Sequence, residues 1–257
     1  MIQNIGIEIK YGFRSGKLLI LLACFLFFAL LTPLMLKFLL PGILESQGAS
    51  SQELSGLMNM TQAGCIHIYM NDVFEIGTII VAFTLCGLLA QEIRDNTLVL
   101  PLCSGKHFSN IVGAKLLIFG FALILISLAA LMVNYLYAGL LFSFDVKIFP
   151  IIQAGILQGI YMNFLLACVI LWGAVAKRPI PTGFLTLATA FGLHFIGSFL
   201  GIHAWLPSGL LEQAQHLLES PESSMILTLT ITNLLIFAMF ALALVRLKNI
   251  EWNERQA

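Results

Sequence analysis

Six long apolar runs constrain this chain more than any other feature of its sequence. They occupy residues 18–40, 73–90, 111–141, 148–176, 180–200 and 225–245. The hydrocarbon core of a bilayer is roughly 30 Å thick and an α-helix rises about 1.5 Å per residue, so about 20 apolar residues cross it. Because the runs are continuously apolar and do not alternate with a period of two, they predict helices and not barrel strands.

The composition excludes a soluble globular domain. Of the 257 residues, 59% are hydrophobic and 10% are charged, whereas soluble domains carry about 25% charged residues. Too few polar side chains remain to cover a water-exposed surface. We therefore predict an all-α integral membrane protein whose six transmembrane helices form one domain over residues 18–246.

The basic residues predict the orientation of these helices. If the N-terminus is cytoplasmic, only Lys37 and Lys147 of the 13 Lys and Arg residues face outside, and basic residues concentrate on the cytoplasmic side of membrane proteins. We expect cytoplasmic termini, external loops at 41–72 and 201–224, and a cytoplasmic tail at 247–257. The expected location is a cell membrane, namely the bacterial cytoplasmic membrane. Nothing in this charge distribution points to a nucleic acid as partner.

Two amphipathic segments accompany the apolar runs. In residues 1–17, one helical stripe is apolar and a neighbouring stripe is basic: Ile2, Ile5, Ile9 and Phe13, beside Lys10, Arg14 and Lys17. This predicts an interfacial helix in contact with membrane lipid, although an ordinary basic flank that sets the topology fits the pattern as well. After Pro207, an apolar face opposes a polar one: Leu210, Leu211, Ala214, Leu217 and Leu218, against Glu212, Gln213, Gln215 and Glu219. This predicts a short outer helix before the last span.

The first external loop contains several soft donors that suit Cu(I): Met58, Met60, Cys65, His67 and Met70. No repeated Met-x-x-Met or Cys-x-x-Cys spacing fixes a coordination sphere among them. Methionine and isoleucine also pack adaptably. We therefore expect these residues to cover the mouth of the bundle, and predict neither a metal nor a cofactor.

The fifth apolar run is the most polar of the six and is the first candidate for a surface that faces a substrate. Its candidate residues are Thr186, Thr189, His194 and Ser198. Hydrogen bonds between helices are the alternative role for polar side chains in spans. Two pairs of small residues four positions apart predict close helix packing: Gly155 with Gly159, and Gly197 with Gly201.

No catalytic motif is present. A P-loop ends in Gly-Lys-Ser/Thr, but Gly16-Lys17 and Gly105-Lys106 are followed by Leu and His. The chain has no His-Glu-x-x-His motif, no Gly-x-Ser-x-Gly elbow and no facing carboxylate pair in the spans. We predict that this chain is not itself an enzyme.

The loop at 91–115, "QEIRDNTLVLPLCSGKHFSNIVGAK", is a polar interruption between the second and third runs. It carries an acidic residue soon after the second run, then a Gly-Thr-Leu-like step, a Leu-x-x-Pro-like turn, a small or basic residue and a Gly-x-Lys-like entry to the third run. These features are Glu92, Asn96-Thr97-Leu98, Leu100-Pro101, Ser104-Gly105-Lys106 and Gly113-Ala114-Lys115. With the six-span topology, this loop resembles the permease subunits of type-2 ABC exporters. Asn96 stands where that family has Gly, and Asn tolerates a left-handed turn.

The resemblance implies that the loop is similar to a coupling helix that docks on a separate cytoplasmic ABC ATPase subunit. The coupling residues that it implies are Glu92, Arg94, Asp95, Thr97, Leu98, Leu100, Pro101, Lys106 and His107. It further implies a second permease subunit, identical or homologous, and a substrate path at the interface between the two, lined by the first, second and fifth spans. ATP hydrolysis is then expected on the ATPase subunit.

A self-sufficient membrane protein is the competing class, either an ATP-independent secondary transporter or an intramembrane enzyme. The loop would then merely join two spans. Secondary transporters commonly contain internal repeats and broken helices; the sequence shows no repeat, and Pro33 is the one residue in the first run able to break its helix.

Overall fold

The computed structural model describes residues 6, 10–12, 14–39, 61–103, 105, 107–202, 205–216 and 225–249. Within these ranges the regular secondary structure is helical throughout, and six helices are long and apolar enough to cross a membrane. They are Lys17–Leu39, Gln62–Arg94, Phe108–Leu141, Ile148–Ala176, Pro179–Leu200 and Ile226–Lys248. The prediction of an all-helical, multi-pass membrane protein is confirmed at this level.

The first two spans are divided into shorter elements. The first consists of α2 (Lys17–Leu34) and the π-helix η1 (Met35–Leu39), and the second of α5 (Gln62–Asp72), η2 (Val73–Gly77), α6 (Thr78–Leu85) and α7 (Gly87–Arg94). The short helix α8 (Val99–Cys103) precedes α9 (Phe108–Leu141), α10 (Ile148–Ala176) and α11 (Pro179–Leu200). Helix α12 (Gly209–His216) lies before α13 (Met225–Lys248).

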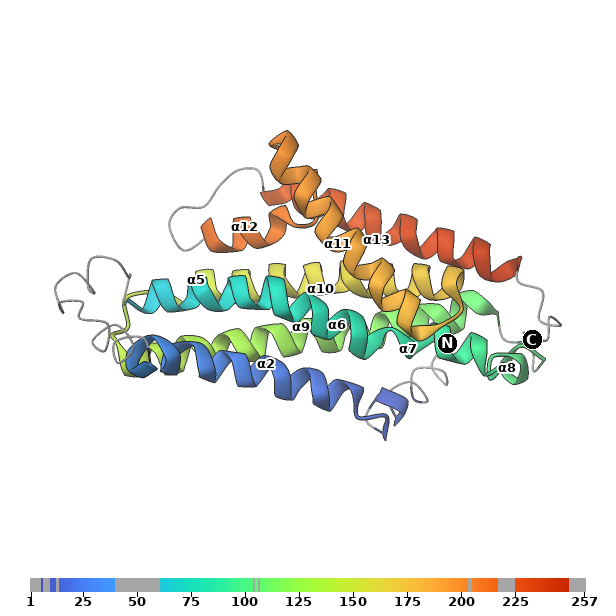
Figure 1. The fold of residues 1–257 in the computed structure, drawn as a ribbon, viewed down its shortest axis with the longest axis horizontal. Coiled ribbons are helices and arrows are strands. Elements are labelled where there is room, and N and C mark those ends of the chain that lie inside the picture. The colour runs from blue at the N-terminus through green and yellow to red at the C-terminus, as the bar shows by residue number, and fades with distance from the viewer. Residues whose placement is uncertain are drawn as a thin grey trace.

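Consecutive spans run in opposite directions (Figure 1). Helices α7 and α8, the first turns of α9 and the last turns of α10 and α13 lie at one end of the bundle, which we call the α8 end. The first turns of α5 and helix α12 lie at the opposite end, called the α12 end. An even number of alternating spans returns the chain to the end at which α2 began.

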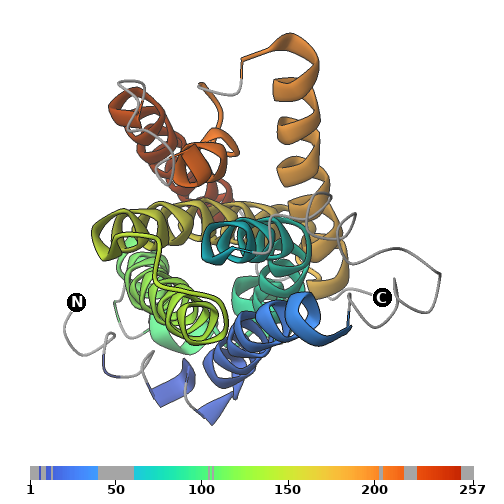
Figure 2. The same ribbon diagram turned by 90° about the vertical axis from the view of Figure 1, so that its left-hand side faces the viewer.

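Helix α10 is the centre of the bundle and contacts α6, α7, α9, α11, α12 and α13. Of its most apolar stretch, 67% is buried, against 22% for α11 and 17% for α13. Figure 2 shows why: α11 and α13 diverge on one side of α10, whereas α9, α2 and the second span pack together on the other. The core therefore lies around α10, and α11 and α13 keep most of their surface for lipid or protein partners.

Glycines allow α10 to approach α9 closely. A Cβ atom added to Gly159 would lie 2.7 Å from the Cα of Ile124, and one added to Gly155 would lie 3.2 Å from the Cα of Leu128. The first of the two predicted glycine pairs thus packs α10 on α9 within the chain. In the second pair, Gly197 is buried in α11 and Gly201 ends that helix at a left-handed φ of 66°.

The second span begins at Gln62, although the hydropathy pattern placed its start at residue 73. The hydroxyl of Thr61 accepts a hydrogen bond from the amide of Gly64 and caps the helix. Gln62 is fully buried: its Nε2 donates to the Tyr135 carbonyl at 3.0 Å, and its Oε1 accepts from the amides of Asp145 (2.9 Å) and Val146 (3.0 Å). These long-range bonds stabilise polar residues that local hydropathy assigns to a loop, and they shorten the expected loop at 41–72.

Helix α12 lies within the segment where the sequence pattern predicts an amphipathic helix, but part of its polar face is covered. Leu210, Leu211 and Ala214 are buried as expected, but Gln213, placed on the polar face, is 7% exposed. Its Nε2 donates to the hydroxyl of Thr228 in α13 at 2.7 Å. Helix α12 packs against α5, α10 and α13, whereas Glu212 on its polar face is exposed.

Candidate functional site

Residues 91–97, at the end of α7, form a hydrogen-bonded turn. The amide of Asp95 donates to the carbonyl of Gln91 at 2.8 Å, and the amide and hydroxyl of Thr97 donate to the carbonyl of Glu92 at 3.0 and 3.3 Å. Between them Asn96 has a φ of 54°, the left-handed conformation expected from its place in the sequence. This turn starts the single-turn helix α8 directly below the end of α7.

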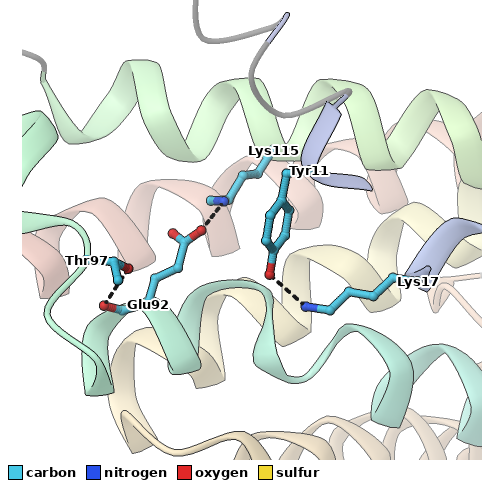
Figure 3. Close-up of polar contacts among 5 residues, drawn as sticks. All are labelled: Tyr11, Lys17, Glu92, Thr97 and Lys115. Carbon is cyan, nitrogen blue, oxygen red and sulfur yellow. Dashed lines mark hydrogen bonds and ion pairs between the residues drawn. The ribbon is translucent and has the colours of Figure 1, made fainter. Parts of the chain in front are cut away.

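An ion pair joins the two ends of the segment (Figure 3). The Nζ atom of Lys115, in α9, lies 2.7 Å from Oε1 of Glu92, in α7. The side chain of Lys115 is 1% exposed and that of Glu92 is 20% exposed. A buried cation is costly unless it is paired, so the two side chains hold α7 and α9 together at the base of the loop.

A tyrosine from the N-terminal segment completes this cluster. The ring centroid of Tyr11 lies 5.3 Å from the Nζ of Lys115 and 5.3 Å from the Nζ of Lys17, which also donates to the Tyr11 hydroxyl at 3.2 Å. Cations attracted to an aromatic face are stabilised by the ring quadrupole. The start of α2, the end of α7 and the start of α9 therefore meet at one polar cluster (Figure 3).

The other loop residues separate into a buried anchor and an exposed rim. Leu98 is 3% exposed, and Pro101 is half-buried. Arg94, Asp95, Thr97 and His107 are exposed. Lys106 and the side chain of Leu100 lie outside the described residues.

A hollow of about 310 Å³ lies between the α8–α9 junction and the end of α13. It is lined by Leu102, His107, Phe108, Ser109, Leu244 and Lys248. Its polar and basic groups surround apolar side chains. The α8 end therefore carries the exposed residues of the loop and, next to them, this hollow.

The four predicted residues of α11 fall into two pairs. Thr186 is fully buried and its hydroxyl donates to the carbonyl of Thr182 at 2.8 Å. Thr189 donates to the carbonyl of Leu185 and accepts from Nε1 of Trp172 in α10 at 2.9 Å. Both threonines are thus engaged in helix packing, the alternative role for polar residues in this span.

His194 and Ser198 line a cavity of about 250 Å³ at the α12 end. The remaining lining residues are Asn71, Phe74, Ser208, Leu211, Glu212 and Gln215. The sequence did not single out Asn71, Phe74 or Ser208 for such a site, because hydropathy alone does not show that α5 and α12 approach α11. It placed Glu212 and Gln215 on the water-facing side of an outer helix.

Of the soft donors expected near the first external loop, the structure describes Cys65, His67 and Met70. Cys65 and Met70 are buried in the packed face of α5. Among the described residues no group of three or more His, Cys, Asp or Glu side chains is placed to hold a metal ion. Met58 and Met60 lie outside the described residues.

No protein-family model, curated protein or solved structure matches this chain.

Proposed function

We propose that this chain is the membrane subunit of an ATP-driven exporter, similar to the type-2 ABC permeases, and that residues 91–115 couple it to a separate cytoplasmic ATPase. The observation that carries the proposal is the ion pair of Glu92 with Lys115. A loop that only joins two spans has no need of a buried salt bridge between its ends. A loop that transmits force does, because its ends must move together with both helices.

The dimensions of the adjoining helices support this role. Helix α9 has 34 residues and the second span has 33, so each is about 50 Å long at 1.5 Å per residue. A bilayer core is roughly 30 Å thick, and part of each helix must therefore protrude. Two protruding helices, clamped together at Glu92 and Lys115, form a rigid lever that can carry the motion of an ATPase into the bundle.

The distribution of basic residues supports a cytoplasmic α8 end. Arg94, Lys177, Arg178, Arg246 and Lys248 lie at the ends of helices that terminate there. Lys37 and Lys147 lie at the α12 end, in η1 and directly before α10. This asymmetry is the one that the positive-inside rule requires of a protein with cytoplasmic termini.

The substrate path is proposed between two permease subunits. The second span lies between α2 and α11, because α6 contacts both helices. All three of these spans expose large apolar side chains, including Phe27, Ile79, Phe83 and Phe184. A second copy that covers these side chains would place the first, second and fifth spans at the interface.

Charge reversal in the loop tests the coupling. The double variant Arg94→Glu/Lys106→Glu reverses two basic charges of the loop and leaves both members of the buried ion pair unchanged. We expect it to reduce both the ATPase subunit that copurifies from native membranes and the ATP hydrolysis stimulated by the permease in lipid nanodiscs. Lys177→Glu/Arg178→Glu, in the turn between α10 and α11 at the same end, is the matched control and should leave both unchanged.

Transport separates the exporter from the competing classes. If the purified chain transports without ATP, and no ATPase subunit copurifies with it, the loop is a simple connection and a secondary transporter is the better reading. Equal ATPase recovery with both double variants would likewise count against docking through residues 91–115.

A further inference from the structure

The cavity at the α12 end is built by three separate parts of the chain. Asn71 and Phe74 come from the second span, His194 and Ser198 from α11, and the remaining lining residues from α12 and the turn before it. The second span lies far from the other two parts in the sequence and meets them only in the fold. Gln215 fixes one wall, because its Nε2 donates to the Oδ1 of Asn71 at 2.6 Å.

An aromatic ring forms a second wall. The ring centroid of Phe74 lies 4.6 Å from that of His194 and 6.1 Å from that of Phe191, which it meets edge to face. Phe74 belongs to the π-helical turn η2, Val73–Gly77. Such turns interrupt α-helices and are frequent at functional sites. This turn occurs in the second span at the level of the cavity.

The polar groups of the cavity favour a ligand that donates hydrogen bonds. Glu212 supplies a carboxylate, which accepts only when it is ionised. Ser208 is 6% exposed, and its hydroxyl oxygen has no partner among the described residues. Buried polar atoms in proteins are normally satisfied, and an unsatisfied one beside a cavity is therefore a candidate contact for a bound molecule.

The electrostatics of the cavity point in the same direction. Neither Lys nor Arg is among its lining residues. Among the described residues that line the cavity, Glu212 is the one carboxylate. At this end, Lys37 donates to the carbonyl of Leu141 at the end of α9, in a different part of the bundle. A negative potential beside an aromatic face attracts organic cations.

We propose that this cavity binds an organic ammonium group, held between the Glu212 carboxylate and the Phe74 ring. Its volume of about 250 Å³ lies just below the roughly 300 to 1,000 Å³ of sites that enclose a drug-sized ligand. It therefore accommodates a head group with a short chain. The assignment of this ammonium group to an exported cargo rests on the proposed function, whereas binding itself does not.

Ligand-observed NMR on the full chain in lipid nanodiscs tests the proposal, with n-butylammonium as probe and butyrate as its anionic counterpart. Saturation transfer to n-butylammonium should exceed that in empty nanodiscs, and butyrate should show none. Glu212 is exposed, so Glu212→Gln should leave the fold intact and weaken n-butylammonium binding about tenfold or more. Glu75→Gln is the matched control: this exposed carboxylate does not line the cavity, and binding should change less than about threefold.

A second variant, Phe74→Leu, keeps an apolar side chain but removes the ring, and should also weaken binding of n-butylammonium. Equal binding of butyrate, absence of n-butylammonium binding, or an unchanged affinity of Glu212→Gln would each overturn the proposal. The measurement contains neither nucleotide nor ATPase. Its failure therefore leaves the coupling experiments standing, and failure of the coupling experiments leaves the binding result standing.

Discussion

The carboxylate of Glu92 and the ammonium of Lys115 lie 2.7 Å apart, although 23 positions separate the two residues in the chain. The pair closes the loop between α7 and α9 at its base, and the Tyr11 ring adds the N-terminal segment to the same cluster. Because Lys115 is almost fully buried, its charge depends on these partners. This ion pair therefore fixes the base of the polar loop to the helical bundle.

Removal of the buried cation should destabilise the bundle. Lys115→Met leaves the largely buried Glu92 carboxylate without the Lys115 ammonium. We expect the free energy of unfolding to fall by about 3 kcal/mol, towards the lower end for broken buried ion pairs, because Glu92 retains some exposure. The double variant Lys115→Met/Glu92→Gln should regain part of the loss. The midpoint of thermal unfolding in a fixed detergent measures both.

Lys248→Met is the control for that comparison, since Lys248 is an exposed cation at the end of α13. We expect its unfolding midpoint to match that of the unmodified chain. Similar midpoints for Lys115→Met and Lys248→Met would show that the buried pair contributes nothing to stability.

The close approach of α9 and α10 should be sensitive to a single methyl group. In Gly159→Ala the new Cβ would meet the Cα of Ile124 at 2.7 Å, so the helices must separate, at a cost of about 2 kcal/mol. In α11, Gly192 has no atom within 4 Å of an added Cβ, and Gly192→Ala should be neutral or slightly stabilising. Thermal unfolding of both variants in the same detergent gives the comparison, and equal stability would argue against tight packing at Gly159.

Hydropathy predicted the number of spans, because any helix in a bilayer must be apolar over the hydrocarbon thickness. It missed the start of the second span, since α5 contains Gln62, His67 and Asn71. The partners that stabilise Gln62 lie in α9 and in the turn after it, and such long-range hydrogen bonds leave no mark on local sequence. The family resemblance placed a left-handed turn at Asn96, a residue type that tolerates this conformation, and Asn96 has a φ of 54°.

Residues of the candidate site could be predicted from the sequence only where their role does not depend on partners from distant parts of the chain. Loop residues were identified as a polar interruption, but the sequence pattern indicated no partner for Lys115, which it counted as the last residue of the loop although the third apolar run begins at residue 111. Lys115 lies within α9, paired with Glu92. On α12, the pattern put Gln213 towards water, whereas α13 covers that face. Amphipathic patterns indicate which face is apolar, but not whether a neighbouring helix also covers the polar face.

Gln62 should hold the turn between α9 and α10. Gln62→Leu removes three hydrogen bonds to backbone atoms in a buried position, for a loss of about 2 kcal/mol. The amides of Asp145 and Val146 lose their acceptor, so their hydrogen exchange should become faster while that of the centre of α10 does not. Gln153→Leu, at a partly exposed position in α10, is the control; equal exchange at Asp145 in both variants would contradict this role.

The left-handed turn at Asn96 should tolerate glycine and reject a branched residue. At a φ of 54° a Cβ atom crowds the following carbonyl, and β-branched residues pay the most, so Asn96→Val should cost about 1 to 2 kcal/mol, whereas Asn96→Gly should cost nothing. Asp95→Val is the control, because Asp95 has a φ of −86°, which any L-residue adopts.

Limited trypsin digestion measures this turn directly, since Arg94 is exposed at the end of α7. When the turn is distorted, the chain around Arg94 loosens and cleavage becomes faster, so Asn96→Val should be cut sooner than Asn96→Gly or Asp95→Val. If the turn also sets the direction of α8, Asn96→Val should lose ATPase stimulation and Asn96→Gly should keep it. Equal cleavage rates for Asn96→Val and Asn96→Gly would mean that the backbone conformation at this position does not hold the loop.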